Sequence, residues 1–88
     1  MKIKEDFVKT ELGDDTILVA IGEKAEHFHG IVRLNETAAF IVDQLARDTT
    51  EEEILTAILK EYDVERSVAQ AHVSSVLESL RTINALEE

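Results

Sequence analysis

The sequence contains no cysteine and no proline among its 88 residues. Without a thiol, disulfide bonds, thiolate nucleophiles and cysteine-ligated zinc or iron–sulfur sites are excluded. The lack of cysteine also suits a reducing compartment. No stretch rich in proline, glycine or serine divides the chain, and this length is enough for one domain but not for two. We therefore expect a single domain over residues 1–88.

Long apolar runs are also missing. No run approaches the length of a membrane span. The first six residues, Met1 to Asp6, lack the apolar core of a signal peptide. We therefore expect a protein of the cytoplasm that has no membrane partner.

Positive charge is scarce, because nine lysines and arginines stand against 19 aspartates and glutamates and leave a formal net charge of -10 at pH 7. A field of this sign repels nucleic-acid phosphates and anionic lipid surfaces. We expect no nucleic-acid partner, and a basic segment of another protein is a better match. The charge also serves solubility, which is the alternative explanation.

Strand-like patterns occupy the first third of the chain. Residues 7–12 predict a first strand, and Gly13, Asp14 and Asp15 form a turn signal after it. Residues 16–21 are rich in β-branched side chains and predict a second strand, and residues 30–34 predict a short third one. Short connections between successive strands favour an antiparallel meander.

Helical patterns follow Asn35, which is a good residue for a helix N-cap. Thr50 and Glu53 have the spacing of a capping box for a second helix. A third helix is predicted over residues 66–83, with Asn84 as its C-cap. The apolar faces of the three helices are expected to contain Ala38, Ile41, Val42 and Leu45; Ile54, Leu55, Ile58, Leu59 and Tyr62; and Ala69, Val73, Val76, Leu77, Leu80 and Ile83.

The predicted fold class is α+β, with a three-stranded antiparallel sheet followed by three helices. A winged helix-turn-helix domain has such parts. A DNA-binding domain of that type needs a basic recognition helix, but residues 66–83 contain only two cations, Arg66 and Arg81. The order of elements thus predicts the fold without predicting DNA binding.

Signals for catalysis and for metal binding are weak. The sequence has no nucleophile elbow, glycine-rich phosphate loop or zinc-hydrolase motif, so we expect no enzyme, no catalytic residue and no cofactor. The acidic groups at residues 14–15 and 51–53 lie at a turn and at a helix start, where a structural role is expected. His27 and His29 have metal-ligand spacing, but only His72 remains as a third imidazole, so we expect no metal site.

Three features indicate contact with another polypeptide. Phe40 lies opposite the main apolar face of its helix, which makes it a candidate for partner contact. The third strand is the last of the meander, and an open strand edge invites an added strand. Beside the core face of the third helix lies a lane of residues that leaves room for another backbone: Val68, His72, Ser75 and Ser79.

The segment from Gly30 to Ile41 resembles the signature G-x-x-x-L-N-E-T-[GA]-A-x-x of PqqD-like proteins. The match continues in order through residues 50–54 and 61–64 and then through Leu77 and Leu80, so that the resemblance covers roughly residues 7–86. The sequence departs from the family at His72, where an acidic residue is common, and at Asn84, where glycine is common.

The resemblance implies a winged helix-turn-helix domain that binds the leader region of a ribosomally made precursor peptide. It also implies a second partner, a modifying enzyme such as a radical S-adenosylmethionine maturase, to which the chain presents the peptide as a chaperone. In related recognition domains the leader adds as a strand beside the third strand and lies against the third helix. On this resemblance, the peptide-binding residues are Gly30, Ile31, Val32, Arg33, Leu34, Val68, His72, Ser75 and Ser79.

The sequence leads to two further expectations. If the leader pairs with the third strand, proline at Val32 is expected to block the pairing. The alternative function is a structural or regulatory interaction module that binds a folded protein and carries no peptide.

Overall fold

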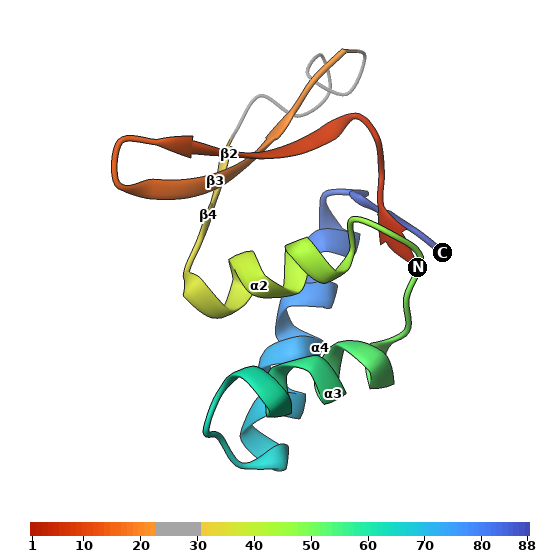
Figure 1. The fold of residues 1–88 in the computed structure, drawn as a ribbon. Helices are drawn as coiled ribbons and strands as arrows, with labels where there is room; N and C mark the ends of the chain where they lie inside the picture. Colours follow the sequence, from red (N-terminus) through yellow and green to blue (C-terminus); the bar gives the residue numbers. More distant parts are fainter. Residues whose placement is uncertain (23–30) are drawn as a thin grey trace.

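A small antiparallel sheet and three helices form most of the fold (Figure 1). The computed structural model describes residues 1–22 and 31–88. The sheet contains β2 (Phe7–Leu12), β3 (Asp15–Ala20) and β4 (Ile31–Leu34) in that order, and α2 (Glu36–Gln44), α3 (Glu51–Glu61) and α4 (Arg66–Thr82) follow it along the chain. The predicted fold class, a three-stranded antiparallel sheet followed by three helices, is therefore confirmed.

A two-residue turn at Gly13 and Asp14 connects β2 to β3 and pairs Leu12 with Asp15. Gly13 has a φ of 63°, whereas Asp14 is not in the left-handed region. Glycine with positive φ at the first loop position is typical of a type II′ turn, whose twist matches that of the flanking strands. The turn sets the β2–β3 register, and β4 then pairs with β3 so that Thr16 lies opposite Leu34.

Side-chain caps begin the first two helices as the sequence predicted. The Asn35 Oδ1 atom accepts a hydrogen bond from the backbone N–H of Ala38 at 2.8 Å, and Thr50 Oγ1 accepts one from the N–H of Glu53 at 3.1 Å. The Glu53 carboxylate instead accepts a bond from the Thr50 hydroxyl at 3.2 Å. Glu53 therefore contacts the side chain of the cap rather than its backbone N–H, and the predicted capping box is only half formed.

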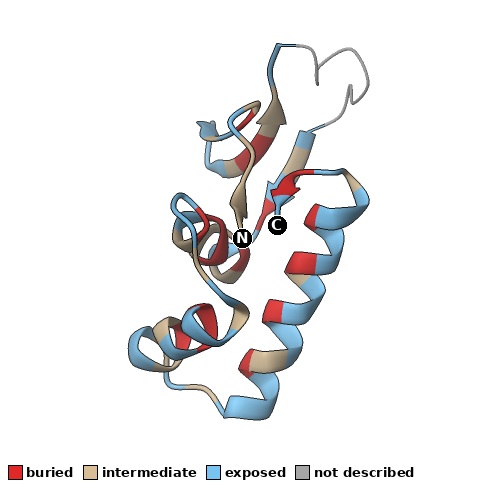
Figure 2. Cartoon of the chain, turned by 90° about the vertical axis from the view of Figure 1, so that its right-hand side faces the viewer, coloured by how far each residue is buried: buried red, intermediate tan, exposed pale blue. Residues whose placement is uncertain are grey.

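The core lies among the three helices and continues to one face of the sheet, and each helix turns one buried stripe toward it (Figure 2). Leu45 and Leu77, each predicted at the centre of a stripe, are fully buried at 0% exposure. The sheet contributes Phe7, Leu18 and Leu34. Among the described residues no charged or polar side chain is buried, so apolar packing alone fills this core.

Two further strands, which the sequence did not predict, join the ends of the chain. β1 (Lys2–Ile3) pairs antiparallel with β5 (Leu86–Glu87), and Ile3 lies opposite Leu86. Each strand has two residues, which is too short for a recognisable period. Burial of Leu86 explains why the C-terminal segment returns to the body of the fold.

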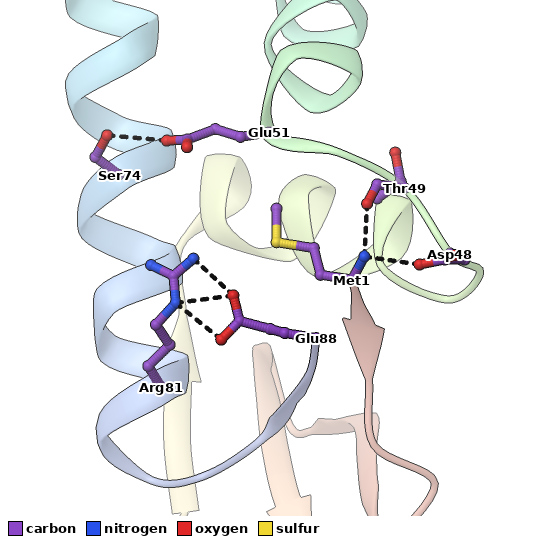
Figure 3. A network of polar contacts seen from close by, with 7 residues as sticks. All are labelled: Met1, Asp48, Thr49, Glu51, Ser74, Arg81 and Glu88. Carbon is purple, nitrogen blue, oxygen red and sulfur yellow. Dashed lines mark hydrogen bonds and ion pairs between the residues drawn. The ribbon is translucent and has the colours of Figure 1, made fainter.

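Polar contacts reinforce this junction (Figure 3). The N-terminal ammonium donates to Asp48 Oδ1 and to the carbonyl of Thr49, both at 2.7 Å. The hydrogen bond from the ammonium holds the pKa of the Asp48 carboxyl below its usual value. Arg81 donates three hydrogen bonds to Glu88, and these lower the pKa of the Glu88 carboxyl.

Truncation of either central leucine tests the helix phasing. We expect Leu45→Ala and Leu77→Ala each to lower the free energy of unfolding by about 2–5 kcal/mol, because each change removes transfer energy and leaves a cavity. Urea unfolding followed by circular dichroism measures this difference. A loss well under 1 kcal/mol at either position would contradict its place in the core.

Asn84 tests the end of α4. It is the only described non-glycine residue with positive φ, at 58°, and its Oδ1 atom accepts a hydrogen bond from Lys4 Nζ at 2.9 Å. Both Asn84→Gly and Asn84→Ala lose this bond, but only alanine is strained in the left-handed region. We expect the alanine variant to be about 1 kcal/mol less stable than the glycine variant by urea unfolding. Equal stability of the two variants would contradict this assignment.

Candidate functional site

The outer edge of β4 is open, since β4 is the last strand of the sheet in the described part of the chain. The register reveals which of its backbone groups face outward. Leu12 and Asp15 flank a two-residue turn and so form a hydrogen-bonded pair. Hydrogen-bonded and non-hydrogen-bonded pairs alternate along an antiparallel ladder, and the bond from Ile21 N–H to the Asp6 carbonyl at 2.8 Å fits this alternation.

Successive residues of β3 point their backbone groups alternately toward β2 and toward β4, and those of Thr16 and Leu18 point toward β4. Their partners Leu34 and Val32 are therefore the hydrogen-bonded residues of β4. The N–H and C=O groups of Ile31 and Arg33 point away from the sheet. Within residues 31–34, the open edge thus offers two donors and two acceptors to an added strand.

This geometry corrects the expectation for proline at Val32. The N–H of Val32 faces β3, so Val32→Pro would remove a bond within the sheet rather than a bond to a partner. Arg33 is the position where proline removes an outward donor and leaves the sheet ladder intact. Register follows from the turn type, which the sequence alone had not fixed.

Side chains of β4 alternate between the two faces of the sheet. Leu34 is buried in the core and Val32 packs against it half-buried, whereas Ile31 and Arg33 are exposed on the other face. The Arg33 guanidinium lies 3.8 Å from an Asp15 carboxylate oxygen, a long and exposed ion pair that contributes little stability.

The two flanks of α4 differ in what they contact. On one flank, Ser74 Oγ donates to Glu51 Oε1 at 3.1 Å and Arg81 binds Glu88 (Figure 3). The other flank is the predicted lane, whose four residues are all exposed and have no hydrogen bond or ion pair among the described residues: Val68, His72, Ser75 and Ser79. Helical spacing places the half-buried Val76 and Ile83 between this lane and the core.

A cavity of about 230 Å³ lies beside the lane, among α2, α3 and α4. His72 and Ala69 line it from α4, and Thr37, three residues after β4, lines it from α2. The remaining lining residues come from α3 and the turn after it: Ile58, Tyr62, Asp63 and Val64. This cavity is large enough for a side chain, and His72 is the lane residue that lines it.

Phe40 lies in a different place. It is half-buried and makes an edge-to-face contact with Tyr62, with ring centroids 5.5 Å apart. Burial, followed by the charges of Glu36 and Glu61, raises the pKa of the Tyr62 phenol. Phe40 lines a second, more acidic cavity of about 460 Å³ between the hairpin turn and α2. Its predicted contact with a partner remains a prediction.

Other candidate residues lie outside the site or outside the described residues. His27, His29 and Gly30 are outside the described ranges. In residues 1–22 and 31–88, no three histidine, aspartate or glutamate side chains come together in a way that would hold a metal ion. Over the same residues, no helix has the length and apolarity needed to cross a membrane.

Comparison with known proteins gives one match to a family model. Residues 16–86 match the model described as coenzyme PQQ synthesis protein D (PqqD), which spans most of the chain. The chain belongs to the PqqD family. The match runs from β3 to β5 and includes both elements of the candidate site, the β4 edge and α4.

Two solved structures resemble this PqqD-family chain. TbiB1 in complex with the TbiA(beta) leader peptide has a TM-score of 0.77 and 25% sequence identity, with 99% of this chain and 95% of TbiB1 covered. A lasso peptide synthetase B1 complexed with its leader peptide has a TM-score of 0.75 and 21% identity, covering 99% of this chain and 96% of the other, and this similarity concerns the fold. Among curated proteins, none shows significant similarity to this chain.

Proposed function

We propose that this chain binds the leader region of a ribosomally synthesised precursor peptide as a strand added to β4. The proposal rests on the open edge at Ile31 and Arg33 together with the free lane on α4, where His72 lines a cavity. Similarity to TbiB1, which was solved with a leader peptide, supports the same function.

The two elements have different parts in binding. The outward N–H and C=O groups of Ile31 and Arg33 pair with the leader backbone whatever its sequence, and they supply a large share of the affinity. Side chains of the leader that point inward meet Val32, the lane and the cavity at His72, and these contacts select the leader. The net charge of -10 favours a leader that carries basic residues.

The chain then acts as a peptide chaperone without a catalytic step of its own. It holds the leader and presents the rest of the precursor to a modifying enzyme, such as a radical S-adenosylmethionine maturase. Residues 1–88 act as one domain in this role. The cytoplasm is the expected place, since ribosomal precursors are made there.

Proline at Arg33 tests the strand pairing. We expect Arg33→Pro to weaken binding of a synthetic leader about tenfold or more, because one outward donor is lost and the edge resists pairing. Candidate leaders are screened from short peptide genes that neighbour the gene of this chain, and isothermal titration calorimetry measures the affinity of each. Circular dichroism must show a folded variant.

The matched control is Glu11→Pro. In the same alternation, the N–H of Glu11 points outward from β2, the other edge strand. This variant is expected to retain leader affinity within about twofold. If Glu11→Pro weakens binding and Arg33→Pro does not, the leader pairs with β2, and the proposed edge is wrong.

Arginine at Ser75 tests the lane on α4. Ser75 is exposed, so Ser75→Arg fills the lane while the core stays unchanged. We expect a loss of leader affinity of about tenfold, because the long side chain occupies space that the leader needs. Ser67→Arg makes the same change on the opposite flank of α4 and is expected to leave the affinity unchanged. Equal affinity of the two variants would argue against contact with the lane.

A further inference from the structure

The face of the sheet that points away from the helices is unusually apolar. Of the five large hydrophobic residues that are exposed in the described part of the chain, four lie on or beside this face with 39–58% exposure: Val8, Leu12, Ile21 and Ile31. The register explains the grouping, because Val8 pairs with Val19 and Val19 pairs with Ile31 across the three strands. Side chains of paired residues lie on the same face.

Ile17 marks the centre of this outer face. It is 4% exposed but does not belong to the core cluster beneath the sheet. Its neighbours across the strands are Thr10 and Arg33, so it is packed among the side chains of the outer face. The outer face is therefore an ordered apolar surface and not a set of isolated exposed residues.

The area of the outer face limits which protein partners it can bind without a further surface. Three strands about 4.8 Å apart, two of six residues and one of four, with about 3.3 Å per residue, span an area of about 250 Å². A stable protein interface buries about 800 Å² on each partner. Pairing of two copies through this face would also bring together two chains of net charge -10. The outer face alone is too small for a stable dimer, and the net charge of each chain opposes one.

An added strand at the edge of β4 enlarges this surface. Side chains of a strand alternate between faces, so half of the leader side chains would join the outer face next to Ile31 and Arg33. The surface is then formed partly by the chain and partly by its cargo. It is continuous with the peptide-binding edge, and a protein that touches it contacts both.

The charges around the outer face indicate the chemistry of that protein. Asp14 and Asp15 lie at the hairpin end beside Leu12, and Asp14 has no cation partner among the described residues. A complementary surface has an apolar centre with lysine or arginine at its rim. An enzyme that must act only on leader-bound precursor gains selectivity from such a composite surface.

We infer that the modifying enzyme docks on the outer sheet face and contacts both the chain and the bound leader, so that it binds the loaded chain more tightly than the empty one. This inference rests on the proposed function, since it requires a leader strand on β4. It assigns to β2 and β3 a role that leader binding itself does not use.

The test uses the modifying enzyme and the leader peptide encoded beside this chain. Biolayer interferometry measures enzyme binding to the immobilised chain with and without saturating leader, and fluorescence anisotropy measures leader binding separately. We expect the leader to tighten enzyme binding at least tenfold. The double variant Val8→Lys/Leu12→Lys should lose this gain and still bind the leader within twofold of the wild type.

Two further variants complete the design. Val8→Thr/Leu12→Gln removes apolar surface without adding charge and should weaken enzyme binding in the same direction, which covers the case in which the lysine variant does not fold. Thr56→Lys/Thr82→Lys adds the same charge at exposed positions on α3 and α4 and should behave as the wild type.

The outcomes separate the two proposals. Normal leader binding with enzyme binding that ignores the leader, or that survives both outer-face variants, would overturn the docking surface and leave the proposed function standing. Absence of leader binding by the wild-type chain would overturn both.

Discussion

The two-residue turn at Gly13 and Asp14 is the constraint on which the rest of the structure depends. It sets the pairing of Leu12 with Asp15, and through β3 it sets the pairing of Leu18 with Val32. A slip of one residue would move buried side chains such as Leu18 to the outer face. The same slip would turn outward those N–H and C=O groups of β4 that now bond to β3. Core packing therefore selects which donors β4 presents to a partner.

The helices leave one side of α4 free for a partner that pairs with the β4 edge. Its core stripe is buried against α2 and α3, and the polar flank is engaged by Glu51 and Glu88. What remains for a partner is the lane through His72 and Ser75, with a cavity beside His72. A peptide along this path contacts a rigid strand on one side and a rigid helix on the other, which reduces the entropy lost by the protein on binding.

Much of the fold could be predicted because its elements have strong periods and clear caps. The first strand is found at residues 7–12 as expected, and Asn35 and Thr50 cap the predicted helices. The pairing of β1 with β5 was missed, since strands of two residues have no period and their partner lies at the other end of the chain. The orientation of the Val32 amide was missed for another reason: it depends on turn type and register, which are set by the packed structure.

For the site, the sequence predicted which elements to examine but not how they are connected. Open strand edges and small-residue lanes are visible as patterns, whereas the cavity that joins Thr37 to His72 requires three helices in contact. Residues 16–21, rich in β-branched side chains, predicted a strand but did not predict an apolar outer face. Its neighbours on β2 and β4 become visible once the strands are paired.

Hydrogen–deuterium exchange of the β4 amides, resolved by residue with nuclear magnetic resonance, tests the central claim most directly. In the free chain, the amides of Val32 and Leu34 should exchange slowly, because they bond to β3, and those of Ile31 and Arg33 should exchange fast. Saturating leader should slow exchange at Ile31 and Arg33 and leave the other two nearly unchanged. Fast exchange at Ile31 and Arg33 in the complex, with leader bound, would show that the peptide does not add to this edge.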